Sequence, residues 1–97
     1  MPQPTALILD DDGTFARAAG QLAFSAGFRV QLAETLAEAR TFLARTRADL
    51  VLLDLHLPDG SGMDLLDDVN LAEHGQVVIV TGRPSLESAA RAVSTPV

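Results

Sequence analysis

The sequence predicts an α/β fold in which a parallel β-sheet carries helices on both faces. Four short apolar runs of strand length alternate with stretches in which apolar residues recur at helical spacing. This order is typical of parallel sheets, in which the crossovers between strands are nearly always right-handed. Several of the runs end in acidic or hydroxyl residues, and such sheets bind their ligands at the carboxyl ends of the strands.

The first strand–helix unit is expected between residues 5 and 27. Residues 5–10 form an apolar run without polar alternation, which indicates a buried strand. Gly27 stands where a helix C-terminus is expected, because glycine readily adopts the left-handed conformation found there. A helix between the two is indicated by apolar residues at helical spacing, namely Phe15, Ala19, Leu22 and Ala26.

The second unit begins with a strand that is expected at an edge of the sheet. Residues 28–32 alternate enough between apolar and polar residues to indicate a half-exposed strand. Residues 35–38 fit a capping box, in which Thr35 and Glu38 each bind the other's backbone N–H group. The helix that follows carries its apolar residues on one face, namely Leu36, Ala39 and Leu43.

Two further strands are expected in the second half of the chain. Residues 49–54 are strongly apolar and indicate a central strand, and residues 76–81 indicate the fourth strand. Residues 57–62 are rich in turn-forming residues, which indicates a loop, and Ser61 is expected to cap the helix after it. Pro84 opens a last expected helix.

Length and composition exclude several classes of function. The 97 residues fit one domain, which we assign to residues 1–97, and the formal net charge is -6. The seven basic residues are scattered and form no patch for nucleic acid. No apolar stretch reaches the ~20 residues of a membrane span, and the N-terminus lacks the pattern of a signal peptide. The absence of cysteine excludes disulfides and thiolate metal ligands, and it fits a cytoplasmic protein.

Acidic residues end two of the apolar runs. Asp10 and Asp11 follow the first run, and Asp54 ends the third. Carboxylates at the ends of buried strands repel one another and are costly to desolvate, so a fold that joins these ends needs a cation there. Oxygen ligands alone favour a hard divalent ion, most simply Mg²⁺. Asp10 and Asp11 are therefore the expected metal site, and Asp54 is the expected nucleophile toward a phosphoryl group.

Each acidic group also has a simpler interpretation. An acidic run before Gly13 is typical of a solvated turn, and Asp54 alone fits an aspartate that caps a loop. A functional role is favoured because these residues fall at the carboxyl ends of expected strands, where one crevice could gather them. Asp12 fits the N-cap of the first helix, where a negative charge meets the positive end of the helix dipole.

Thr81, Gly82 and two histidines complete the candidates. Thr81 ends the fourth expected strand and its hydroxyl could bind a phosphoryl oxygen, while Gly82 leaves space beside it. His56 and His74 lack the paired spacing of metal ligands. The backbone carbonyl of His56 could still ligate Mg²⁺, and His74 is expected at a helix end.

Three stretches of the chain resemble the receiver domain of two-component response regulators. They are residues 7–12 (LILDDD), residues 49–62 (DLVLLDLHLPDGSG) and residues 77–82 (VVIVTG). Within the second stretch, Pro58 and Gly60 match the family's loop after the phosphoacceptor. The resemblance spans nearly the whole chain, and it implies a flavodoxin-like fold with the strand order 2-1-3-4-5.

The resemblance implies a role for each matching residue. Asp54 looks like the phosphoacceptor, Asp11 like the direct Mg²⁺ ligand, and Asp10 like a ligand that acts partly through water. The main-chain oxygen of His56 matches the third protein ligand, and Thr81 matches the switch hydroxyl. The domain would then be a switch rather than an enzyme, with at most self-phosphorylation and self-dephosphorylation.

The resemblance also implies the partners. The phosphoryl donor would be a phosphohistidine on a sensor histidine kinase, and the domain would switch an output domain in a longer chain. That output domain could bind DNA, since residues 81–90 are reminiscent of receivers on enhancer-binding transcription activators. No contact of this domain itself with nucleic acid or membranes is expected, and a homodimer is left open.

The sequence departs from the family near its end. The family continues with a fifth strand that carries a lysine at the phosphate, followed by a fifth helix. This chain contains no lysine and stops at Val97, before either element. We therefore expect a receiver domain that is incomplete at its C-terminus and that binds Mg²⁺. It is expected either to accept phosphoryl groups poorly or to restore its sheet edge by pairing with another chain.

Two other functions compete with this interpretation. Residues 10–14 (DDDGT) resemble the nucleophile motif of haloacid-dehalogenase-like phosphatases, with Asp10 as nucleophile and Asp12 as acid or base. The downstream lysine of that family is absent, however, and Asp54 would have no role. The third hypothesis is an interaction module without phosphorylation, which the intact acidic residues oppose.

Overall fold

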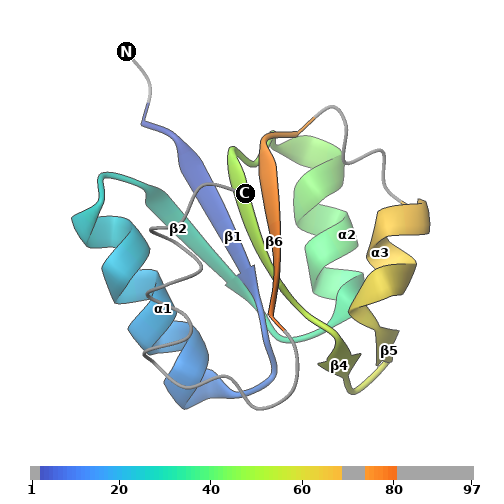
Figure 1. The fold of residues 1–97 in the computed structure, drawn as a ribbon. Coiled ribbons are helices and arrows are strands. Elements are labelled where there is room, and N and C mark those ends of the chain that lie inside the picture. The colour runs from blue at the N-terminus through green and yellow to red at the C-terminus, as the bar shows by residue number, and fades with distance from the viewer. Residues whose placement is uncertain (1–2, 69–73, 81–97) are drawn as a thin grey trace.

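The computed structural model describes residues 3–68 and 74–80 of the chain. Within these ranges, four parallel strands form one sheet, and helices cover both of its faces (Figure 1). Thr81, Gly82 and the expected last helix lie outside the described residues. No helix in the described ranges has both the length and the apolar character needed to cross a membrane.

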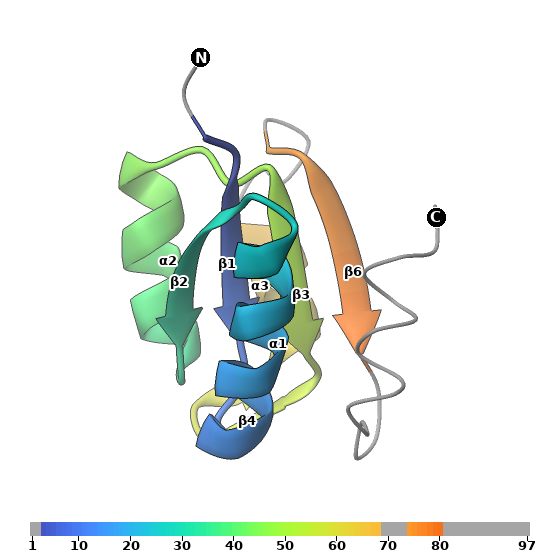
Figure 2. The same ribbon diagram turned by 90° about the vertical axis from the view of Figure 1, so that its left-hand side faces the viewer.

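The main sheet has the strand order β2-β1-β3-β6, and all of its neighbouring strands run parallel (Figure 2). Its strands are β1 (Thr5–Leu9), β2 (Arg29–Ala33), β3 (Leu50–Asp54) and β6 (Gln76–Val80). The inner strands β1 and β3 are buried along their whole length, whereas β2 at the edge is mostly exposed. The expected α/β class and the order of the first four strands are therefore confirmed.

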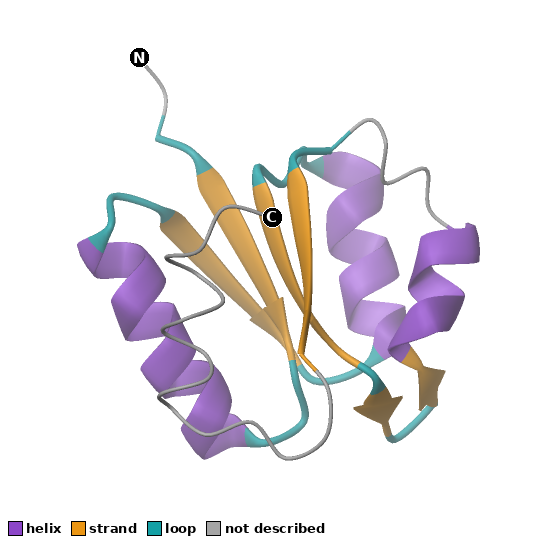
Figure 3. Ribbon diagram, viewed as in Figure 1, coloured by secondary structure: helices purple, strands orange, loops and turns teal. Residues whose placement is uncertain are grey.

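The three described helices divide between the two faces of the sheet (Figure 3). α1 (Gly13–Ser25) covers one face, and α2 (Leu36–Arg45) and α3 (Gly62–Asp68) lie on the other. Even-numbered residues of β1 and β3 pack with α1, and odd-numbered residues pack with α2 and α3. This alternation fixes the register of the sheet, because a slip by one residue would exchange the two faces.

α1 packs against the sheet through only some of the apolar residues whose spacing indicated a helix. Two of those four residues are buried, but Leu22 is 37% exposed and Ala26 is also exposed. Ala16 and Ala23 are buried in their place, and their small side chains let the helix lie close to the sheet. The expected end of the helix is confirmed, since Gly27 has a φ of 98°.

α2 packs through the residues that its periodicity indicated. Leu36, Ala39 and Leu43 are all buried. Half of the expected capping box forms, since Thr35 Oγ1 accepts a hydrogen bond from the Glu38 N–H at 3.2 Å. The Glu38 carboxylate reaches back to the Thr35 hydroxyl, at 3.4 Å, and not to a backbone group.

A short antiparallel hairpin stands where the sequence indicated an irregular loop. β4 (His56–Leu57) pairs with β5 (Gly60–Ser61), and the two residues between them form the turn. The turn-forming residues that suggested a loop are those that such a hairpin also needs. Ser61 Oγ accepts a hydrogen bond from the Met63 N–H at 3.2 Å, so the expected cap of the next helix is confirmed.

Candidate functional site

The parallel register of β1 and β3 brings two of the expected acidic residues together. Leu9 pairs with Leu53, so Asp10 and Asp54 occupy the next positions along the two neighbouring strands, at the lower edge of the sheet in Figure 1. Both continue the even-numbered alternation that faces α1, and their side chains therefore emerge on the same side. Asp54 also pairs with Val80, the last residue of β6, so β6 ends at this edge as well.

Asp11 joins this pair to form an acidic cluster. One carboxylate oxygen from each of Asp10, Asp11 and Asp54 lies within 4.8 Å of the other two. Asp10 and Asp54 are 4% and 8% exposed, whereas Asp11 is open to solvent. Oxygen ligands at this spacing suit a hard divalent cation. The expected convergence of the strand ends is confirmed, and the cluster could hold a metal ion.

Backbone hydrogen bonds orient both buried carboxylates. Asp10 Oδ1 accepts the Asp12 N–H at 2.8 Å, and Asp54 Oδ1 accepts the His56 N–H at 3.2 Å. Each bond reaches two residues ahead, as in an Asx turn. One oxygen of each carboxylate is thereby fixed, which orients the whole group.

Asp12 lies beside the cluster but caps α1. Its Oδ1 accepts the Thr14 N–H at 3.1 Å and the Phe15 N–H at 3.2 Å. A carboxylate at this position is stabilised by the positive end of the helix dipole. The expected N-cap is therefore confirmed.

The pKa of the Asp10 carboxyl reflects its burial and its acidic neighbours. It is raised from 3.8 to about 6. Desolvation by burial is the largest cause, the charges of Asp54, Asp11 and Asp12 add to it, and the hydrogen bond from the Asp12 N–H opposes it. A bound divalent cation would offset the repulsion and favour the ionised form. The electrostatics of the cluster therefore fit a cation site as well as its geometry does.

We expect Asp10→Asn to stabilise the metal-free domain at neutral pH by about 1–3 kcal/mol. Between about pH 4 and pH 6, the folded state holds a proton on Asp10 that the unfolded chain has lost. The free energy of unfolding contributed by this group therefore falls as the pH rises through that interval. Urea unfolding in EDTA at several pH values measures the difference between the variant and the wild type.

The stabilisation by Asp10→Asn should disappear below about pH 4, where Asp10 of the wild type is protonated in both the folded and the unfolded state. Two other carboxyls make the stability depend on pH only in that lower range. The pKa of Asp49 is lowered chiefly by the hydrogen bond from the Thr5 N–H, and the pKa of Asp59 chiefly by that from the Leu36 N–H. Their stabilisation is lost as the pH falls through their folded pKa values, and it cancels when the two proteins are compared. A gain that stays constant across all pH values would contradict the prediction.

The two histidines have different positions. The His56 side chain is exposed, and the backbone N–H of His56 donates to Asp54 Oδ1. The role of the His56 backbone carbonyl as a metal ligand stays a prediction. His74 Nδ1 accepts the Ala48 N–H at 3.0 Å, just before β3 begins, at the opposite end of the sheet. Among the described residues, the acidic cluster includes neither histidine.

Sequence reasoning missed the contacts of two residues that follow Asp54 in the chain. The Asp59 carboxylate accepts hydrogen bonds from the Leu36 and Ala37 N–H groups at the start of α2, at 2.9 and 3.1 Å. Gly62 lies so close to β3 that a Cβ there would be 2.1 Å from the Asp54 carbonyl oxygen. The turn composition predicted a bend at these residues. It could not predict that Asp59 binds backbone groups more than twenty residues earlier in the chain.

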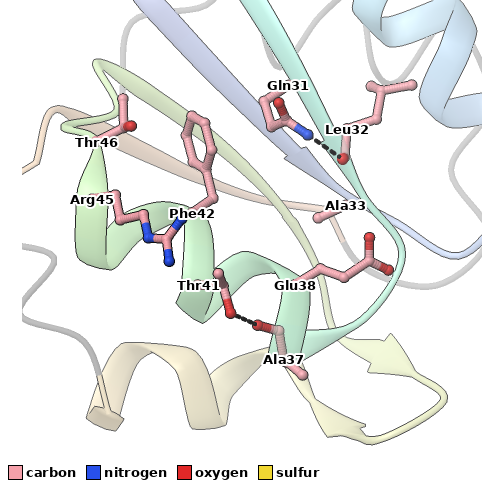
Figure 4. Close-up of a pocket in the computed structure, with 9 residues that line it drawn as sticks. All are labelled: Gln31, Leu32, Ala33, Ala37, Glu38, Thr41, Phe42, Arg45 and Thr46. Atoms are coloured by element: carbon pink, nitrogen blue, oxygen red, sulfur yellow. Dashed lines mark hydrogen bonds between the residues drawn. The ribbon is translucent and has the colours of Figure 1, made fainter.

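A pocket on another side of the molecule holds none of the candidate residues (Figure 4). It has a volume of about 480 Å³ and lies between the edge strand β2 and α2. Its two charged side chains, Glu38 and Arg45, are exposed and opposite in sign. Its lining contains a single carboxylate and therefore no cluster that could hold a divalent cation, so the acidic cluster remains the candidate site.

Sequence comparisons identify relatives over almost the whole chain. The family model of the response regulator receiver domain matches residues 6–96. The transcriptional regulatory protein DpiA of Escherichia coli (strain K12) is 37% identical over 92 residues, which cover 92% of this chain and 41% of DpiA. The chain spans half or less of the length of this and several other regulatory proteins that it matches.

Solved structures of response regulator proteins also superpose on this chain. The CheY-like response regulator receiver domain protein from Methanospirillum hungatei JF-1 superposes with a TM-score of 0.77 at 29% identity, covering 95% of this chain and 74% of that one. A response regulator protein from Burkholderia pseudomallei superposes with a TM-score of 0.75 at 25% identity, covering 93% and 54%. That crystal structure contains a phosphorylated aspartic acid, a calcium ion and citrate.

The family match includes the three stretches that carry the sequence resemblance, and the parallel sheet agrees with the flavodoxin-like fold expected from it. The phosphatase alternative is not favoured, because the relatives are response regulators. Receiver domains of this kind are signalling switches. The chain belongs to the response regulator receiver domain family.

Proposed function

We propose that this domain accepts a phosphoryl group on Asp54, with Mg²⁺ held by Asp10, Asp11, Asp54 and the main-chain carbonyl of His56. The observation that carries the proposal is the acidic cluster at the ends of β1 and β3, in which one carboxylate oxygen from each residue lies within 4.8 Å of the other two. Asp54 is the acceptor because it ends the central strand and occupies the acceptor position of the family motif. Its burial keeps most water from the carboxylate.

The transfer itself needs only one nucleophile from the protein. A carboxylate oxygen of Asp54 attacks the phosphorus of a phosphohistidine on a sensor kinase, the phosphorus–nitrogen bond breaks, and its electron pair stays on the imidazole nitrogen. The product is an acyl phosphate on Asp54. The His56 N–H holds Oδ1, which directs the other oxygen to the donor. Mg²⁺, when bound, neutralises charge on the transferring group.

The switch in this proposal depends on Thr81. Val80, the residue before it, pairs with Asp54 across the sheet. A hydroxyl that binds the new phosphoryl oxygens would favour one of two arrangements of the domain, and Gly82 would leave room for that change. The domain acts as a switch and not as an enzyme, apart from reactions on its own Asp54.

The relatives support the partners in the proposal. Because the chain spans 41% of DpiA, whose name describes a transcriptional regulatory protein, residues 1–97 would serve as the receiver of a longer cytoplasmic regulator with a transcriptional output domain. A sensor histidine kinase would supply the phosphoryl group. The domain itself would contact neither nucleic acid nor membranes, and sedimentation with and without beryllofluoride tests whether it forms a homodimer.

Peptide mapping after treatment with acetyl phosphate and Mg²⁺ tests the acceptor. We expect one adduct that is sensitive to hydroxylamine, on the peptide that contains Asp54, and none in EDTA. Labelling should be slow, because the chain has no lysine to bind the phosphoryl group. An adduct on Asp10 would contradict the proposal and support the phosphatase hypothesis.

A further inference from the structure

We propose that Asp59 is a positioning residue for phosphoryl acceptance, because its carboxylate fastens the hairpin that follows Asp54 to the N-terminus of α2. We call its two hydrogen bonds, to the Leu36 and Ala37 N–H groups, the Asp59 clamp. The inference rests on the proposed function, since it concerns the geometry of Asp54 and of the His56 carbonyl.

The clamp is a strong contact by its chemistry. Oδ1 accepts the Leu36 N–H at 2.9 Å, and Oδ2 accepts the Ala37 N–H at 3.1 Å, so both oxygens of one carboxylate bind one helix turn. The positive end of the helix dipole favours the negative charge there. The hydrogen bond from the Leu36 N–H, with that from Ala37, holds the pKa of the Asp59 carboxyl below its usual value. The clamp is therefore intact at neutral pH.

The turn of the hairpin is also pressed against α2. Gly60 has a φ of 147°, and a Cβ there would lie 2.9 Å from Leu36 Cδ1. The Leu36 side chain is itself 1% exposed and packs in the same core as Leu53, the residue before Asp54. Asp59 therefore ties the turn to a part of α2 that packs in the same core as the end of β3.

The other end of the hairpin is joined directly to the acceptor. Asp54 Oδ1 accepts the His56 N–H, and the Gly62 N–H donates to the Leu55 carbonyl at 3.0 Å. A Cβ on Gly62 would lie 2.1 Å from the Asp54 carbonyl oxygen, so there is little free space between β3 and α3. A shift of the turn would therefore be transmitted to the backbone of His56 and to the orientation of the Asp54 carboxylate.

A simpler role for Asp59 is that of a helix cap alone. Thr35 provides the matched comparison, because its hydroxyl accepts the Glu38 N–H in the same helix turn. Thr35 belongs to the segment between β2 and α2, whereas Asp59 belongs to the β4–β5 hairpin. Both substitutions remove a cap from α2, but only the change at Asp59 releases the hairpin.

The experiment compares Asp59→Ala, Asp59→Asn and Thr35→Ala in the whole chain. Urea unfolding gives the stability of each variant, titration followed by NMR gives the Kd for Mg²⁺, and acetyl phosphate at saturating Mg²⁺ gives the rate of labelling per folded molecule. We expect Asp59→Ala and Thr35→Ala to lose similar stability. Asp59→Ala should raise the Kd for Mg²⁺ at least threefold and slow labelling at least fivefold, while Thr35→Ala changes neither by more than twofold.

Asp59→Asn keeps one acceptor oxygen and should lie between the wild type and Asp59→Ala, which also covers the case that the alanine variant does not fold. The clamp is overturned if both Asp59 variants match Thr35→Ala in Kd and in labelling rate. Failure of the proposed function looks different, because the wild-type label would then map away from Asp54 or be absent. The Kd for Mg²⁺ would still decide whether Asp59 positions the hairpin.

Discussion

Asp54→Asn is expected to slow phosphoryl incorporation by at least about 100-fold. An amide oxygen is a much weaker nucleophile than a carboxylate oxygen, and it cannot form the acyl phosphate. The shape of the site should change little, because the asparagine side-chain oxygen can still accept the His56 N–H. Intact-mass spectrometry after treatment with acetyl phosphate and Mg²⁺ measures the change.

Asp11→Asn is the matched control for this prediction. It removes one charge from the same acidic cluster but leaves the acceptor in place. We expect weaker Mg²⁺ binding and slow labelling that recovers as the Mg²⁺ concentration rises. Labelling of Asp54→Asn should not recover in this way, and a rate within tenfold of the wild type would contradict the assignment.

Gly62→Ala should lower the free energy of unfolding by about 2–4 kcal/mol. The new Cβ would lie 2.1 Å from the Asp54 carbonyl oxygen and 3.1 Å from Leu53 Cδ1. A backbone carbonyl in a central strand cannot rotate away as a flexible side chain can, so either the end of β3 or the start of α3 must shift. Urea unfolding measures the loss, and slower labelling of Asp54 should accompany it.

Gly13→Ala serves as the control for adding a methyl group. A Cβ at Gly13 would meet only the Arg17 side chain, at 3.3 Å, and an arginine can move aside. Because alanine favours helix more than glycine does, the change should be neutral or stabilising by up to about 1 kcal/mol. Equal changes in the free energy of unfolding for Gly13→Ala and Gly62→Ala would show that the close contact with Asp54 is not what destabilises Gly62→Ala.

The acidic cluster could be predicted because it depends on two local patterns. The strand-length apolar runs identify β1 and β3, and the residue that ends each run is read directly from the sequence. Parallel strands begin and end at the same edges of a sheet, so residues at the carboxyl ends of neighbouring strands meet. The convergence of Asp10 with Asp54 also requires β1 and β3 to be neighbours, and that strand order was implied by the family resemblance.

The surroundings of the cluster could not be predicted in the same way. The capping box was expected to satisfy the N-terminus of α2 locally, whereas Asp59 binds its first two N–H groups from another loop. The spacing of Leu22 indicated a helix, but which side of α1 faces the sheet depends on how closely Ala16 and Ala23 approach it. Both outcomes depend on tertiary contacts, for which a single sequence contains no periodic signal.

The even-numbered alternation that buries β1 and β3 against α1 also directs Asp10 and Asp54. One residue inserted in the middle of β3 would turn the Asp54 carboxylate toward α2 and reverse the inward and outward positions beyond the insertion. Core packing and chemistry would fail together. Insertions and deletions should therefore be tolerated only in the connections between the strands. A change of length there alters neither the core packing nor the direction of the site carboxylates.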